Sequence, residues 1–511
     1  MEIITSIPSF LVNEILSAPA FLIGIITAIG LSAMKRPVGQ VIGGAIKATL
    51  GFFLIGGGAG LVVDSLEPLG TMIAGATGAQ GVVPTNEAIA GIAQAKYGAQ
   101  VAWIMILGFA ISLLLARLTR LRYVFLTGHH VLFMATMVTI IFATAGWSTW
   151  LVVSVGSLGL AILMVTLPAF AHPFTRKITG DDSIAIGHFG TAGYIAAGAI
   201  GKAVGKNSRS TEDMKLPEGL RFLRDSMVST ALSMALMYII LALLFIARAG
   251  TEEAFTAFPN GATSVGNYIV QSFTQGLQFG VAVAVILFGV RTVLGELVPA
   301  FQGIAAKVVP GAIPALDCPI VFPYAQNAVL LGFIFSFLGG LIGLGILSIW
   351  LHPAFGLVLI LPGLVPHFFT GGAAGVYGNA TGGRRGAMLG AFANGLIITF
   401  LPSLLLGVLG EFGGENTTFG DADFGWFGLF IGSAARLSLV PAVLVVLIVY
   451  ASIFVAALVV QKRFVENVSL VKQESDAKAV QSGRPISVKN YPKVLPPEGA
   501  PRPPQAADIV S

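Results

Sequence analysis

Residues 310–319 read PGAIPALDCP, and this stretch indicates the fold more clearly than any other part of the chain. Its prolines flank one carboxylate, Asp317, between two long apolar tracts. At membrane depth, helix-breaking residues are tolerated only where the backbone is buried in protein or lines water. The interval 310–326 therefore predicts a re-entrant hairpin beside a polar cavity. The interval 68–94, equally apolar and equally broken, predicts a second one.

The sequence around these intervals is that of an integral membrane protein. Of its 511 residues, 55% are hydrophobic and only 10% are charged, whereas about a quarter of a soluble domain is charged. Apolar stretches of roughly 18 residues or more can span a bilayer. They predict an all-α membrane protein with about eleven transmembrane helices, near residues 18–34, 38–63, 101–116, 124–144, 149–171, 228–247, 268–290, 329–351, 355–369, 388–409 and 427–460.

Composition also excludes several functions. The single cysteine, Cys318, allows neither a disulfide framework nor a cysteine metal cluster, and the net charge of +5 is too small to indicate nucleic-acid binding. The chain contains no G-x-x-x-x-G-K-[ST] loop and no H-E-x-x-H motif. We therefore expect no cofactor, no metal site, no catalytic residue and no ATP-driven pump.

Polar segments divide the chain. Residues 1–461 are expected to form one polytopic transport domain, in which the polar interval 172–225 is cytoplasmic or interfacial, and residues 462–511 a disordered cytoplasmic tail. The acidic connection 411–423 is expected on the outer side. A short pattern recurs and indicates either duplicated halves or chance: Val38, Gly43, Lys47 and Gly51 match Val298, Gly303, Lys307 and Gly311.

Titratable side chains inside apolar stretches mark the candidate site, because a charge at membrane depth is costly unless it faces a cavity or a partner. His129 follows a glycine, and a neutral imidazole offers one donor and one acceptor to a pair of hydroxyls. An interfacial histidine bonded to a carbonyl is the alternative. His130 is expected to face elsewhere, since adjacent helical residues diverge by about 100°.

Three further positions have the same character. His188 also follows a glycine, although a histidine at the cytoplasmic surface would fit its polar interval equally well. Asp317 is either a pocket carboxylate on broken backbone or the cap of a short helix. Asn86 and Glu87 pose the same choice in the first half of the chain.

Taken together, these segments resemble the membrane subunit, component IIC, of the ascorbate type of the bacterial phosphotransferase system. The resemblance covers residues 24–459. It rests on LTGH at 126–129, IGH at 186–188, DMKLP at 213–217, DSMVSTA at 225–231, PGAIPALDC at 310–318, NAV at 327–329 and Gly382-Gly383.

This resemblance implies a multi-pass homodimer in the bacterial inner membrane, with a scaffold and a mobile core in each subunit. It implies a small polyhydroxylated substrate that a separate IIB protein, charged by IIA, phosphorylates in the cytoplasm. The family's substrate contacts fall on Asn86, Glu87, His129, His188 and Asp317.

Two positions depart from the pattern of family members that handle ascorbate. Such members can carry glutamine four residues after the first motif histidine and one residue after the second, where this chain has Phe133 and Phe189. Each lost hydrogen bond is worth on the order of 1 kcal/mol. We include both rings among the expected substrate-binding residues, because an aromatic ring can stack on a sugar face.

Three functions compete at this stage. The first is group translocation of ascorbate or a related sugar or sugar acid. The second is an ion-coupled secondary transporter on the same scaffold, with Glu87 and Asp317 as proton or cation sites. The third is a membrane receptor or sensor without turnover.

Overall fold

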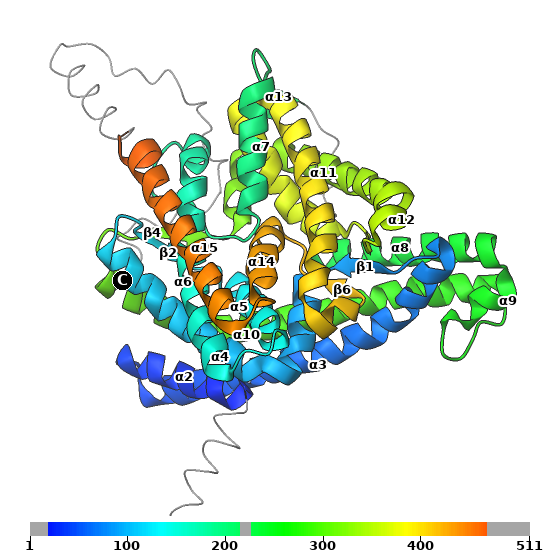
Figure 1. The fold of residues 1–511 in the computed structure, drawn as a ribbon, viewed down its shortest axis with the longest axis horizontal. Helices are drawn as coiled ribbons and strands as arrows, with labels where there is room; N and C mark the ends of the chain where they lie inside the picture. The colour runs from blue at the N-terminus through cyan, green and yellow to red at the C-terminus, as the bar shows by residue number, and fades with distance from the viewer. Residues whose placement is uncertain (1–18, 215–225, 468–511) are drawn as a thin grey trace, which may run out of the picture.

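The computed structural model describes residues 19–214 and 226–467, which form a mostly helical body (Figure 1). Most of the predicted tail and parts of the motifs at 213–217 and 225–231 lie outside the described residues. The helices are α2 (Pro19–Ala33), α3 (Val38–Thr77), α4 (Asn86–Leu118), α5 (Gly128–Thr144), α6 (Thr149–Thr179), α7 (Thr191–Val204), α8 (Ser226–Ala249), α9 (Thr251–Ala254), α10 (Val265–Val308), α11 (Gln326–Ile346), α12 (His352–Phe355), α13 (Leu364–Leu405), α14 (Ala422–Ala435) and α15 (Leu439–Val460).

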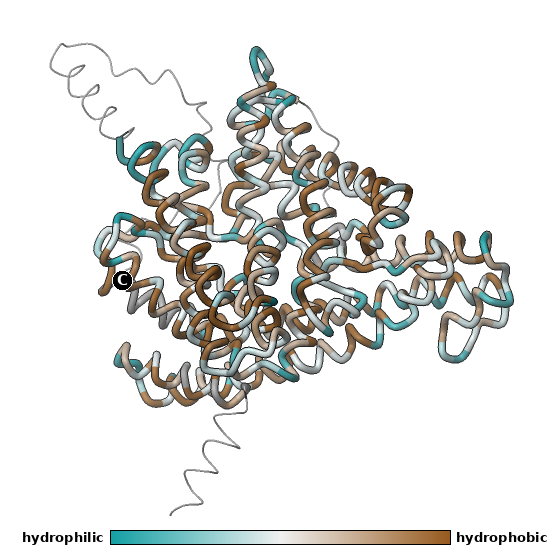
Figure 2. Tube along the Cα trace, in the orientation of Figure 1, coloured by the Kyte–Doolittle hydropathy of each residue, from teal (hydrophilic) through white to brown (hydrophobic). Residues whose placement is uncertain are grey.

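Eight of the described helices are long and apolar enough to cross a membrane. Hydrophobic residues follow the lengths of the helices, and hydrophilic ones gather near their ends (Figure 2). The prediction of a helical membrane protein is confirmed, but its count of about eleven spans is not. The predicted span 355–369 contains a strand and the start of α13, and the predicted span 427–460 divides into α14 and α15. An apolar run alone does not distinguish a buried strand or a helix break from a continuous helix.

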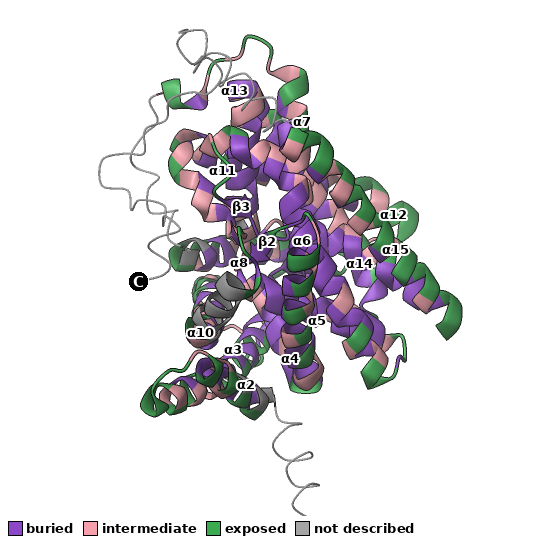
Figure 3. Cartoon of the chain, turned by 90° about the vertical axis from the view of Figure 1, so that its left-hand side faces the viewer, coloured by how far each residue is buried: buried purple, intermediate pink, exposed green. Residues whose placement is uncertain are grey.

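The helices pack in two groups. Helices α3, α8 and α10 lie along one another and carry α9 at their far end, whereas α7, α11 and α13 form a second group at the top of the view (Figure 1). Buried residues are dense around α4, α5 and α6 (Figure 3). Small residues permit the close contacts, since a Cβ on Gly332 would lie 2.3 Å from the carbonyl oxygen of Gly371.

Within residues 19–214 and 226–467, six short strands of two to four residues each form two parallel sheets. They are β1 (Gly81–Pro84), β2 (Tyr123–Phe125), β3 (Ala185–Ile186), β4 (Ile313–Leu316), β5 (Leu359–Ile360) and β6 (Thr417–Thr418). In the first sheet β1 lies between β5 and β6, and in the second β4 lies between β2 and β3. The two intervals predicted as re-entrant hairpins thus supply the central strands, and their predicted re-entry into the membrane is not confirmed.

The order of elements recurs in the two halves of the chain. A long helix, a central strand and a further helical segment appear as α3, β1 and α4, and again as α10, β4 and α11. The short sequence pattern noted above pairs the beginning of α3 with the end of α10. It therefore does not mark this recurrence.

Helix α13 is broken at Gly382-Gly383, one of the motifs quoted above. Gly383 has φ 56° and ψ −148°, a conformation that residues with a Cβ rarely adopt. A Cβ there would also meet the carbonyl oxygens of Ser208 and Arg209 at 2.6 and 2.4 Å. The glycine pair thus lets the loop after α7 pack against the broken helix.

Candidate functional site

The strand ends define the site. A residue at or just beyond the end of every strand lines one cavity of about 280 Å³, near the lower end of ligand pockets, which run from roughly 300 to 1,000 Å³. The six residues, in the order β1 to β6, are Asn86, His129, His188, Asp317, Gly363 and Asp421. Helix N-termini follow the strands, so partial positive charge converges on the cavity.

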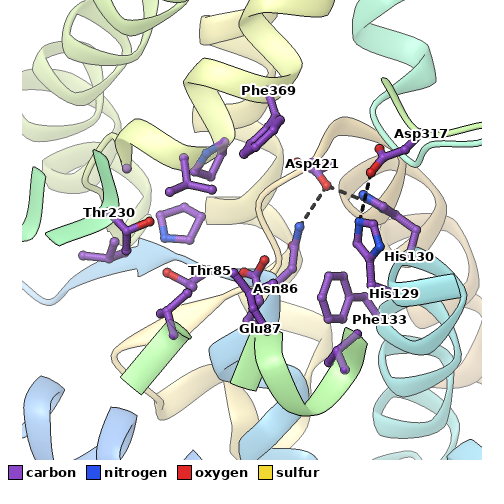
Figure 4. Close-up of a pocket in the computed structure, with 18 of the residues that line it drawn as sticks. Thr85, Asn86, Glu87, His129, His130, Phe133, Thr230, Asp317, Phe369 and Asp421 are labelled. Atoms are coloured by element: carbon purple, nitrogen blue, oxygen red, sulfur yellow. Dashed lines mark hydrogen bonds and ion pairs between the residues drawn. The ribbon is translucent and has the colours of Figure 1, made fainter. Parts of the chain in front are cut away.

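Asp317 joins the two motif histidines. Its Oδ2 lies 3.4 Å from His129 Nε2, and its Oδ1 lies 3.8 Å from His188 Nε2. Figure 4 shows Asp317 above His129 at one side of the cavity. Asp317 also accepts a hydrogen bond from the N–H of Cys318, at 2.7 Å, and so caps the short 3₁₀ helix η5 (Cys318–Tyr324). The capping and pocket interpretations of this residue are therefore both correct.

His188 is fixed from behind. The N–H of Gly190 donates to its Nδ1 at 2.9 Å, and the hydroxyl of Tyr194 lies 2.9 Å from the same nitrogen. Since Nδ1 accepts, the neutral ring carries its proton on Nε2, which faces Asp317. The side chain is 4% exposed, so the alternative of a surface histidine is wrong. The segment 185–204, from β3 through α7, packs against α6 and α13.

Asn86 is held at both ends of its amide. Its Nδ2 donates to Asp421 Oδ2 at 2.8 Å, and its Oδ1 accepts from the N–H of Gly420 at 2.9 Å. Glu87 follows in the first turn of α4 and lines the cavity beside it (Figure 4). The amide thereby couples the beginning of α4 to the segment before α14.

The two phenylalanines take different places. Phe133 lines the cavity, with its ring centroid 5.9 Å from that of His129. Phe189 is fully buried and stacks on Phe125 at 5.1 Å, outside the lining of the cavity. Of the seven expected substrate-binding residues, the structure gathers all but Phe189 around one space; that they bind substrate stays a prediction.

Sequence reasoning missed three titratable residues of the cavity, Arg291, His130 and Asp421. His130, expected to face elsewhere, also lines the cavity. The N-terminal end of α5 adjoins the cavity, so adjacent residues of its first turn can both line it. The ring centroid of His130 lies 3.8 Å from that of His188. Asp421 belongs to the acidic connection 411–423, which the sequence places on the outer side. In the structure its side chain is 3% exposed and lines the same cavity.

Asp423, two residues later, has a structural role. It accepts hydrogen bonds from the N–H groups of Thr191 and Ala192, at 2.7 and 3.1 Å, and from Trp426 Nε1. These bonds cap α7 and hold it beside α14. The acidic connection therefore places one carboxylate on a helix end and the other in the cavity.

A helical body with eight apolar spans, whose broken segments enclose a small polar cavity, defines a multi-pass membrane permease. A family model described as "PTS system sugar-specific permease component" matches residues 14–423, and the chain belongs to this family. It is a membrane component of a sugar phosphotransferase system, and it lies in the bacterial cell membrane.

One curated relative is similar over most of the chain. It is described as "Ascorbate-specific PTS system EIIC component" and comes from Mycoplasma pneumoniae. The two sequences are 28% identical over 420 residues, which are 74% of this chain and 63% of the relative. The match thus spans less than two thirds of the relative's length.

Proposed function

We propose that the chain binds ascorbate or a related small sugar or sugar acid in this cavity and carries it across the membrane. In this proposal a separate IIB protein, recharged by IIA, transfers a phosphoryl group to a substrate hydroxyl at the cytoplasmic side. The observation that carries the proposal is the meeting of His129, His188 and Asp317 at one small cavity. Three groups able to hydrogen-bond there suit a ligand rich in hydroxyls.

The remaining architecture follows the same proposal. Residues 1–461 form one transport domain, which comprises a scaffold and a mobile core and works as a homodimer. Residues 462–511 follow it as a cytoplasmic tail. Rigid movement of the core then exposes the cavity to each side in turn. The exposed basic side chains Lys202, Lys206 and Arg209, near the break in α13, supply part of the IIB docking face.

Vesicle uptake tests the proposal. Vesicles containing the chain are loaded with IIA, IIB and a phosphoryl donor, and labelled ascorbate, pentitols and hexuronates are supplied outside. The labelled substrate should accumulate only when all three additions are present, and the recovered label should be phosphorylated. Accumulation that is equally fast without IIB would overturn the proposal.

The second candidate is ion-coupled transport, and the position of Glu87 favours it. This carboxylate is half-buried against the cavity and has no ion pair among the described residues. A proton or cation could therefore bind there with the solute. Uptake of unmodified solute driven by an imposed ion gradient would establish this function instead.

A further inference from the structure

Beyond the expected contacts, the cavity contains a second polar group of residues, Asn86, His130 and Asp421. We infer that His130 and Asp421, with Asn86 as their support, form a second hydroxyl-binding subsite that makes the permease select uncharged polyhydroxylated substrates over sugar acids. This inference rests on the proposed binding of substrate in the cavity, and it narrows the substrate class.

The first observation is an incomplete hydrogen bond. Nδ1 of His130 is buried and has no hydrogen-bond partner in the part of the chain that the structure describes, and it lies 3.9 Å from Asp421 Oδ2. This gap is too long for a direct hydrogen bond. One hydroxyl can satisfy both groups with a small shift of the ring, by accepting from the ring N–H and donating to the carboxylate. Buried polar atoms are seldom left unpaired.

The second observation is that this pair adjoins the expected contacts. The His130 ring adjoins both Asp421 and the His188 ring, and His188 Nε2 in turn lies 3.8 Å from Asp317 Oδ1. In Figure 4, Asp421 and Asp317 flank the two histidines of α5 at one side of the cavity. A ligand with several adjacent hydroxyls can therefore bridge the two carboxylates.

The third observation concerns charge. The carboxylates that line the cavity among the described residues are Glu87, Asp317 and Asp421, and the only cationic side chain is that of Arg291. Four of the six helix ends that follow the strands already have acidic partners from the chain, whereas α5 and α13 have no acidic residue in their first turn. Asp317 caps η5, Asp423 caps α7, and Glu87 and Asp421 lie in the first turn of α4 and at the start of α14. An anionic substrate would meet net repulsion, whereas a neutral polyol only gains hydrogen bonds.

The fourth observation concerns shape. Phe133 offers the cavity an apolar ring, whose centroid lies 5.9 Å from that of His129. A ring suits the C–H face of a neutral sugar or alditol and gives nothing to an enolate or carboxylate oxygen. The polar pair His130 and Asp421 lies beside this ring, since the ring centroids of His130 and Phe133 are 5.9 Å apart.

A metal ion is the competing occupant. Ligand atoms of His130, His188 and Asp421 lie within 4.8 Å of one another, a spacing compatible with a cation. However, the Asn86 amide already donates an N–H to Asp421 Oδ2, the oxygen nearest His130 Nδ1. A hydroxyl can share the carboxylate with that N–H, so the same geometry also fits a sugar hydroxyl, and the experiment below distinguishes the two occupants.

Equilibrium binding to the purified full-length protein tests the inference. Calorimetry compares pentitols and hexitols with ascorbate and a hexuronate at neutral pH. An uncharged ligand should bind at least tenfold more tightly than either anion. Asp421→Asn keeps the hydrogen-bonding shape but removes one charge, so it should shrink this ratio by at least threefold. Glu411→Gln is the control, because Glu411 is exposed and pairs with Lys96 away from the cavity.

Three results would overturn the inference. The first is tighter binding of ascorbate than of every uncharged ligand, and the second is a ratio unchanged by Asp421→Asn. The third is stoichiometric Zn²⁺ binding that requires Asp421 while sugar binding does not. The assay contains no phosphoryl donor, so its outcome is independent of IIB coupling. Phosphorylation-coupled uptake of ascorbate by a protein that prefers ascorbate would sustain the proposed function and refute this inference.

Discussion

In the proposed binding site, Asp317 is the carboxylate that contacts both His129 and His188. We predict that Asp317→Asn weakens sugar binding by tenfold or more. A hydrogen bond to a charged group is worth roughly 1.5–3 kcal/mol, and about 1.4 kcal/mol corresponds to a factor of ten. Calorimetry on the purified variant measures the change. Asp181→Asn, in an exposed loop, is the control, and unchanged binding by the Asp317 variant would contradict the prediction.

Asp182 connects α6 to the end of the chain that the structure describes. It lies 2.8 Å from His172 Nε2 and pairs with Arg176, whose guanidinium also donates to the carbonyl oxygen of Val465 at 3.2 Å. The hydrogen bond from His172, followed by the contacts with Arg176, holds the pKa of Asp182 well below its usual range. The ionised form is therefore the one that the folded state favours.

We predict a corresponding dependence of stability on pH. The pKa of Asp182 is lower in the folded state than its unfolded value near 3.9, so its contribution is present above about pH 4 and is lost as the pH falls further. Thermal unfolding midpoints of the protein and of Asp182→Asn should differ at neutral pH and converge on acidification. A constant difference down to the lowest accessible pH would refute the prediction.

At the scale of elements, the break in α13 positions the loop that follows α7. Gly383→Ala should destabilise the fold by about 1–3 kcal/mol, because the left-handed backbone and the nearby carbonyl oxygens both exclude a Cβ. Thermal unfolding measures the loss. Gly57→Ala is the matched control, since nothing lies within 4 Å of its added carbon and alanine favours a helix. An equal effect of both changes would argue against a special role for the break.

The long helices can be predicted from the sequence, whereas the short strands cannot. The long apolar helices and the meeting of His129, His188 and Asp317 follow from composition, broken backbone and resemblance. The strands do not, because segments of two to four residues are too short to show an alternating pattern, and β6 is a pair of threonines. Without the strands, nothing in the sequence places Asp421, which follows β6, beside Asn86, which follows β1.

At the scale of the whole molecule, we predict that charge on the segment after α7 governs the encounter with IIB. The double change Lys202→Glu and Lys206→Glu should slow phosphorylation-coupled uptake several-fold, most strongly at low salt, and leave sugar binding unchanged. Lys462→Glu, an exposed basic residue elsewhere, is the control. Equal slowing by both variants, or none by the double change, would place the docking face elsewhere.

The exchange of strands between the two halves has a consequence for biogenesis. The central strand β1 finds its neighbours only in β5 and β6, and β4 finds its own in β2 and β3. A growing polypeptide can therefore insert its early helices into the bilayer long before its ligand pocket exists. The backbone groups of β1 that pair with β6 obtain their partners only after residue 418 has been translated. A ribosome stalled halfway would therefore hold a transporter that is inserted in the membrane but not completely folded.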